Sequence, residues 1–285
     1  MKRLMLSGLR FCGPVIGILL LLVPAPASAQ AVRNLAGFST NVLAANDDGS
    51  TALVATGLSM NFFGTTYTGL YVNNNGNVTF TSAYSPYTPS GLISVGQPII
   101  APFFADVDTR GSGSGLVHYG NDTVNGRPAF GVEWPAVGYY SAHTNKLNTF
   151  ELILINRTDT GAGNFDIEMN YGTILWETGD ASGGSNGLGG VSAAAGYSNG
   201  TTPGTYQFPG SLVNGALING GPNALISNDL GSSTLGRYLF TVRSGVPGGG
   251  TAPPTVPVLS PQLLAALIVL LGAASLFAMR KVRQP

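Results

Sequence analysis

The sequence predicts an all-β protein, an antiparallel β-sandwich, followed by one C-terminal transmembrane helix. Three observations support this. Between residues 30 and 250, apolar and polar residues alternate in several short runs, as in half-buried strands. Clusters of Gly, Asn, Ser and Thr separate these runs, and no helical stripe of useful length interrupts them. Near the C-terminus, an uncharged apolar run extends from Leu263 to Met279.

Residues 148–156 (NTFELILIN) and 164–171 (NFDIEMNY) show the clearest strand patterns. In the first, both faces carry apolar residues, so we expect this strand to be covered on both sides. In the second, Phe165, Ile167, Met169 and Tyr171 are expected to point into the core, and Asn164, Asp166, Glu168 and Asn170 to point out. Shorter strands are expected at residues 58–63, 78–80, 99–104, 116–119, 130–134, 191–197 and 238–242. The glycine-rich segments 180–190 and 201–228 are expected to be surface loops.

The N-terminal 29 residues have the three parts of a signal peptide. Basic residues precede an apolar run at 15–23, and Ala27-Ser28-Ala29 provides a small-x-small cleavage site after Ala29. Cleavage there removes Cys12, the only cysteine, so the mature chain can form no disulfide. Residues 30–244 are of a size that suits one domain. Residues 245–255 (GVPGGGTAPPT) are expected to be a Gly/Pro linker.

The apolar run at 263–279 is about 17 residues long, which is the short end of what crosses a hydrocarbon core. Arg280, Lys281 and Arg283 follow it, as the positive-inside rule expects of a cytoplasmic end. The segment before the run should therefore lie outside the cell, exported and at least transiently anchored to the membrane.

The exported part is acidic although the whole chain has no net charge. All 13 acidic residues of the chain lie in it, together with 13 − 6 = 7 of the 13 basic residues, so its net charge is 7 − 13 = −6. Its only lysine is Lys146. Nucleic acids and anionic lipid headgroups need a basic face, so this composition argues against both as partners.

Several segments resemble, in order, the motifs of the NIDO (nidogen-like) extracellular domain. Residues 99–119 (IIAPFFADVDTRGSGSGLVHY) resemble its "IAPFWADVDTR" segment and the strand that follows. Residues 132–140 (VEWPAVGYY), 148–155 (NTFELILI), 165–176 (FDIEMNYGTILW) and 194–199 (AAGYSN) resemble later motifs. Phe104 and Tyr238 stand where the family usually has tryptophan. The resemblance implies a nidogen-like β-sandwich and a role in cell–matrix adhesion.

Residues 256–285 resemble bacterial C-terminal sorting signals of the PEP-CTERM and IPTL-CTERM type. They have a short proline-containing motif that begins at Val256-Pro257, then the apolar helix and the basic end. Val258 replaces the usual threonine of this motif, and Pro261 stands where an acidic residue is usual. The resemblance implies a sorting or processing protease that acts at this motif.

Asp106 and Asp108 form, with Gly111, a D-x-D-x-x-G pattern that resembles the start of a calcium loop. Against this, Arg110 occupies the place of a third ligand and Val117 stands at the twelfth position, where an acidic residue would close the loop. The alternative is that both aspartates accept hydrogen bonds at a strand end, with Arg110 paired to one of them. No other cofactor is expected.

Three aromatic residues, Trp134, Tyr139 and Tyr140, are candidates for stacking on a sugar, although aromatic residues at strand spacing are also typical of a core. Glu133 and Glu151 are the candidate carboxylate pair of a glycosidase. No tight acidic cluster in the sequence supports this enzymatic alternative.

Together these features favour an exported, non-enzymatic protein at the cell surface or in the matrix, with an unidentified matrix or surface polymer or protein as partner. Two alternatives stay open. One is a carbohydrate-binding or carbohydrate-cleaving sandwich, and the other is a calcium-stabilised structural module of the cell surface.

Overall fold

The computed structural model describes residues 30–249. The expected signal peptide with its cleavage at Ala29, the motif at Val256 and Pro257, and the apolar run at 263–279 lie outside the described residues. Within residues 30–249, no helix is long and apolar enough to cross a membrane.

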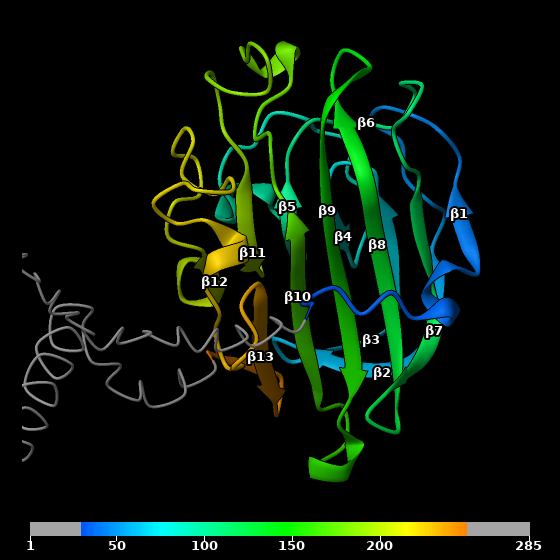
Figure 1. The fold of residues 1–285 in the computed structure, drawn as a ribbon. Helices are drawn as coiled ribbons and strands as arrows, with labels where there is room; N and C mark the ends of the chain where they lie inside the picture. The colour runs from blue at the N-terminus through cyan, green and yellow to red at the C-terminus, as the bar shows by residue number, and fades with distance from the viewer. Residues whose placement is uncertain (1–29, 250–285) are drawn as a thin grey trace, which may run out of the picture.

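The described chain folds into two antiparallel sheets that face each other (Figure 1). The strands of the larger sheet are β1 (Asn41–Leu43), β6 (Val107–Asp108), β7 (Val117–Val124), β8 (Arg127–Tyr139), β9 (His143–Asn156), β10 (Phe165–Thr173), β13 (Arg237–Arg243) and β14 (Val246–Gly249). Their order is β1-β7-β8-β9-β10-β13-β14, and β6 pairs with the C-terminal end of β8.

The smaller sheet has the order β12-β11-β5-β4-β3-β2. Its strands are β2 (Val54–Phe62), β3 (Thr65–Asn73), β4 (Asn77–Thr79), β5 (Ile99–Phe104), β11 (Ala194–Ser198) and β12 (Thr205–Gln207). Short 3-10 helices connect or cover the strands: η1 (Ala36–Ser39), η2 (Leu92–Val95), η3 (Thr158–Thr160), η4 (Asp180–Ser182), η5 (Thr202–Gly204) and η6 (Leu225–Ser227). Every segment expected to be a strand overlaps an observed one, and the pairings between strands are antiparallel. The all-β antiparallel prediction is therefore confirmed for the described residues.

Strand β9 is covered on both faces, as its sequence predicts. Its inward residues join the main core between the sheets, and the largest fully buried side chains of this core include Trp134, Trp176 and Phe150. On the opposite face, Ile153 and Ile155 pack in a second cluster with Phe38 of η1. The helix η1 therefore provides the outer cover that the apolar pattern of β9 requires.

Strand β10 also alternates as expected, but its polar outer face is buried. Asp166 is 5 % exposed, Glu168 2 % and Asn170 0 %. Arginine side chains cover this face: Arg157 and Arg243 pair with Asp166, while Arg33 and Arg237 pair with Glu168. Because each buried carboxylate has cationic partners, the face can be covered without leaving these charges unpaired.

Two expectations about loops and linkers need correction. Residues 201–228 were expected to be a surface loop, but they contribute Phe208, Leu217 and Leu225 to the main core. Residues 246–249, expected to belong to the linker, form β14 and pair with β13. Such pairing uses backbone groups, so a glycine- and proline-containing segment without an apolar pattern can join the edge of a sheet.

Candidate functional site

Five aspartates gather among the loops at one end of the sandwich, the upper end in Figure 1. They come from the segment after β1, the connection between β5 and β6, β6 itself, and η4: Asp47, Asp48, Asp106, Asp108 and Asp180. We call this group the acidic end. Three of its members, Asp47, Asp48 and Asp106, form the one group among residues 30–249 whose carboxylate oxygens converge closely enough to hold a metal ion, so the acidic end is the candidate functional site.

The turn between β3 and β4 holds the acidic end together. Asn74 Nδ2 donates to the backbone oxygens of Asp47 and Val107, at 2.5 Å each. Asn75 Nδ2 donates to Asp48 Oδ1 at 2.8 Å, and Asn75 Oδ1 accepts from the N–H of Val107 at 3.0 Å. A single turn thus fixes the segment after β1 against the β5–β6 connection, although the two are far apart in sequence.

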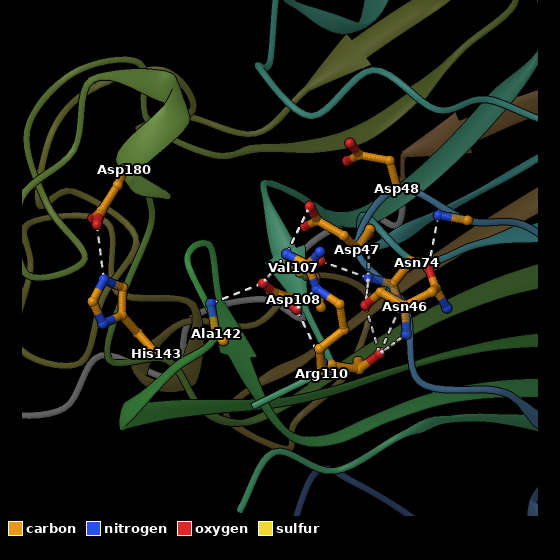
Figure 2. A network of polar contacts seen from close by, with 12 residues as sticks. Asn46, Asp47, Asp48, Asn74, Val107, Asp108, Arg110, Ala142, His143 and Asp180 are labelled. Carbon is orange, nitrogen blue, oxygen red and sulfur yellow. Dashed lines mark hydrogen bonds and ion pairs between the residues drawn. The ribbon is translucent and has the colours of Figure 1, made fainter. Parts of the chain in front are cut away.

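Asp108 is fully paired by hydrogen bonds. Arg110 donates to both of its oxygens, at 2.9 Å from Nε and 2.7 Å from Nη2, and the N–H of Ala142 donates at 2.8 Å. Figure 2 shows Asp108 between Ala142 and Arg110. Burial raises the pKa of Asp108, but these hydrogen bonds outweigh it and hold the pKa below its ordinary value. Arg110 also donates to Asp47 Oδ2 at 3.0 Å.

Asp106 is in the opposite situation, because it is 2 % exposed and its Oδ2 atom has no hydrogen-bond partner within residues 30–249. Burial, followed by the charges of nearby aspartates, raises its pKa to about 8. Burial and the neighbouring Asp48 and Asp108 raise the pKa of Asp47 to about 6. One carboxylate oxygen from each of Asp47, Asp48 and Asp106 lies within 4.8 Å of the others. Such a set of acceptors suits a hard cation.

Comparison with known proteins identifies the fold that carries this site. A family model described as the nidogen-like domain matches residues 68–244, which is more than half of the chain. This chain belongs to the nidogen-like domain family. The family predicted from the sequence motifs is thus confirmed, and both Asp106 and Asp108 lie within the matched range.

The relatives are much longer proteins. Alpha-tectorin from Mus musculus is 35 % identical over 188 residues, which cover 58 % of this chain and 8 % of that protein. Alpha-tectorin from Gallus gallus is 36 % identical over 188 residues, 58 % of this chain and 9 % of that protein. Nidogen from Drosophila melanogaster is 27 % identical over 180 residues, 53 % of this chain and 12 % of that protein. The chain therefore matches about a tenth of the length of these relatives. No solved structure matches it.

In this nidogen-like domain, two of the three candidate sugar-stacking residues lie in the core. Trp134 is fully buried, stacks on Phe150 with ring centroids 5.0 Å apart, and donates from Nε1 to Asn74 O at 3.0 Å. Tyr139 is fully buried as well, and its hydroxyl donates to Asn145 at 2.9 Å. Tyr140 alone is partly exposed and faces the acidic end, with the Arg110 guanidinium 6.0 Å from its ring centroid. Of these three candidates, Tyr140 alone is exposed enough to stack on a ligand.

The candidate carboxylate pair, Glu133 and Glu151, lies opposite in the β8–β9 register on the outer face of the larger sheet. Glu133 is 7 % exposed and Glu151 is 0 % exposed. The N-terminal segment covers both, because Ser39 Oγ donates to Glu133 at 2.6 Å and the N–H of Arg33 donates to Glu151 at 3.1 Å. A sugar would have to displace this segment to reach them.

Asp47 and Asp48 were not among the sequence-predicted site residues. They occupy a polar turn cluster at 46–50, which indicates a loop and nothing more. Asp48 and Asp106 are 58 positions apart, so no local motif contains both. Only the fold brings them together, through the hydrogen bonds of Asn74 and Asn75.

Proposed function

We propose that this chain is an exported, non-enzymatic adhesion protein that binds an extracellular polymer or protein through its nidogen-like domain. The observation that supports this most is the family match over residues 68–244. The loops of the acidic end offer a polar, negatively charged surface with a partly exposed aromatic side chain, Tyr140. The buried state of Glu133 and Glu151 favours binding over hydrolysis.

We also propose that an N-terminal signal peptide and a C-terminal apolar run direct the domain to the outside of the cell. A signal peptide would be cleaved after Ala29, and the apolar run at 263–279 would hold the chain in the membrane with its basic end in the cytoplasm. A sorting protease would then act near Val256 and Pro257. Mass spectrometry of the mature protein from its own cells would test this, because the three events leave different terminal masses.

The adhesive role can be tested with cells that export the full chain. Such cells should be retained under flow on a surface coated with the extracellular polymers of their own species, and cells without the chain should be washed off. The same polymers should be assayed for new reducing ends. Retention without new reducing ends supports adhesion, whereas sugar release that Glu133→Gln abolishes would overturn it in favour of the carbohydrate-cleaving alternative.

A further inference from the structure

The carboxylate of Asp106 lacks the partners that a buried charge needs. It is 2 % exposed, and its Oδ2 atom accepts no hydrogen bond from any residue between 30 and 249. An ionised carboxylate that is buried without a partner destabilises the folded state. Asp108, two residues further on, has the opposite environment, with Arg110 and the Ala142 N–H as donors. The contrast marks Asp106 as a carboxylate that the residues between 30 and 249 leave without compensation.

Two more carboxylates converge on Asp106. Asp47, Asp48 and Asp106 each place an oxygen within 4.8 Å of the other two, and the Oδ1 atom of Asp47 is also buried without a partner in the described part of the chain. Arg110 reaches Asp47 Oδ2, but the same guanidinium already binds both oxygens of Asp108. One arginine cannot compensate four carboxylates, so the cluster keeps a negative charge.

We propose that Asp47, Asp48 and Asp106 bind a calcium ion at the acidic end. All donors are carboxylate oxygens, which hard cations prefer. Mg²⁺ is usually held by one or two carboxylates and several waters in a strict octahedron, whereas Ca²⁺ accepts more carboxylates in a flexible geometry. Three converging carboxylates therefore fit calcium better than magnesium.

The space at the site fits a partly hydrated ion. The cavity has a volume of about 180 Å³ and is lined by Asp47, Asp48, Tyr87, Asp106, Tyr140 and Ala181. Calcium takes six to eight oxygen ligands, so three carboxylates leave places for water, and a cavity of this size has room for several waters. Sites of this kind in extracellular modules bind with a Kd of about 10⁻⁴ to 10⁻³ M.

The ion would join two segments that are distant in sequence. Asp47 and Asp48 follow β1 of the larger sheet, and Asp106 follows β5 of the smaller sheet. Calcium would therefore stabilise the fold by linking the two sheets at one end, and would place an ion beside Tyr140. This proposal does not rest on the adhesive role, because a purely structural domain would bind the ion equally well.

The test uses the full chain purified in detergent and freed of metal with a chelator. Isothermal titration with CaCl₂ should give one site with a Kd below about 1 mM, and Tm should rise by several degrees at 5 mM CaCl₂. MgCl₂ at the same concentration should raise Tm much less. Absence of both a binding isotherm and a Tm shift up to 10 mM CaCl₂ would overturn the proposal, and so would an equal effect of Mg²⁺.

Two variants and a control locate the site. Asp48→Asn should fold, because Asn75 can still bond to the remaining side-chain oxygen, and should weaken calcium binding at least tenfold. Asp106→Asn should abolish binding. It should also melt at a higher temperature than the metal-free wild type at pH 7, because the wild type must take up a proton at this raised-pKa carboxyl on folding and the amide does not. Asp229→Asn makes the same change of charge in another loop and should bind calcium as the wild type does. Wild-type affinity in Asp48→Asn would overturn the assignment of the site.

Discussion

Arg33 donates two hydrogen bonds to the carboxylate of Glu168, from Nε at 2.7 Å and from Nη2 at 2.9 Å. The residues are 135 positions apart, and Arg33 lies before the first strand of the domain. Its backbone N–H also donates to Glu151 at 3.1 Å. Arg33 therefore holds the N-terminal segment against the outer faces of β9 and β10 and forms hydrogen bonds with two buried carboxylates.

Replacement of Arg33 should consequently destabilise the fold more than loss of an exposed ion pair. In Arg33→Met, Glu168 keeps Arg237 as its one cationic neighbour among residues 30–249, with the Nε atom of Arg237 3.2 Å away. We expect the free energy of unfolding to fall by about 2–3 kcal/mol, since a buried carboxylate loses charged donors. Urea denaturation at pH 7 measures this loss.

The control is Arg127→Met, which removes an exposed pair with Asp159, whose side chains are 41 % and 45 % exposed. Solvent screens this pair, so we expect a loss of at most about 0.5 kcal/mol. Equal losses in the two variants would show that Arg33 does not have the anchoring role argued above.

Glu151 should make the stability of the domain depend on pH. Burial raises the pKa of its carboxyl from 4.5 to about 7, against the opposing hydrogen bonds from Asn170 and the Arg33 N–H. Between these values the unfolded chain loses the proton while the folded chain keeps it. The free energy of unfolding therefore falls as pH rises from about 4.5 to about 7, by at most about 1.4 kcal/mol per pH unit for this group.

Glu151→Gln isolates this contribution from those of other carboxyl groups. The variant and the wild type should have similar stability at pH 4, and the variant should become the more stable of the two by about 1–3 kcal/mol at pH 7.5. Urea denaturation across this pH range gives the difference between the two curves. A constant difference from pH 4 to 7.5 would contradict the raised pKa of Glu151.

The sequence was sufficient to predict the strands whose side chains alternate and the face that each residue occupies. Strands β8, β9 and β10 were predicted for this reason. It did not predict that the polar face of β10 is buried, because the covering groups are Arg33 and Arg237, far away in the chain. It also missed β14, whose pairing with β13 depends on backbone groups that leave no apolar pattern.

The candidate site was only partly predictable for the same reason. Asp106 stood out because a local D-x-D-x-x-G pattern contains it. The sequence left open a second possibility, a pairing between Arg110 and one of the two aspartates, and the structure shows this pairing at Asp108. Asp47 and Asp48 belong to the cluster only because the turn that contains Asn74 and Asn75 fastens their loop to the β5–β6 connection.

That turn also requires a glycine. Gly76 has φ +70°, and a Cβ at this position would overlap the backbone oxygen of Phe103. Gly64 in the β2–β3 turn has φ +86° but no atom within 4 Å of such a Cβ. The two glycines therefore share a left-handed backbone and differ in the space around them.

Gly76→Ala should accordingly cost far more stability than Gly64→Ala. We expect about 1 kcal/mol for Gly64→Ala from backbone strain alone. We expect at least about 3 kcal/mol for Gly76→Ala, or complete unfolding at 25 °C, because the turn must move away from β5. Circular dichroism during urea denaturation measures both, and similar losses would contradict the steric argument.

Gly179 offers a way to disturb the proposed calcium site without removing a ligand. Its backbone, with φ −81° and ψ 162°, is one that any residue adopts, but a Cβ there would overlap the carboxylate of Asp106. Gly179→Ala should push this carboxylate out of place and weaken calcium binding at least tenfold in isothermal titration. Gly189→Ala is the control in the same loop, since φ is +82° and no atom lies within 4 Å of the added Cβ. Gly189→Ala should lower the free energy of unfolding by about 1 kcal/mol because of backbone strain, and it should bind calcium as the wild type does.

Unchanged calcium affinity in Gly179→Ala would mean that the Asp106 carboxylate does not hold the ion.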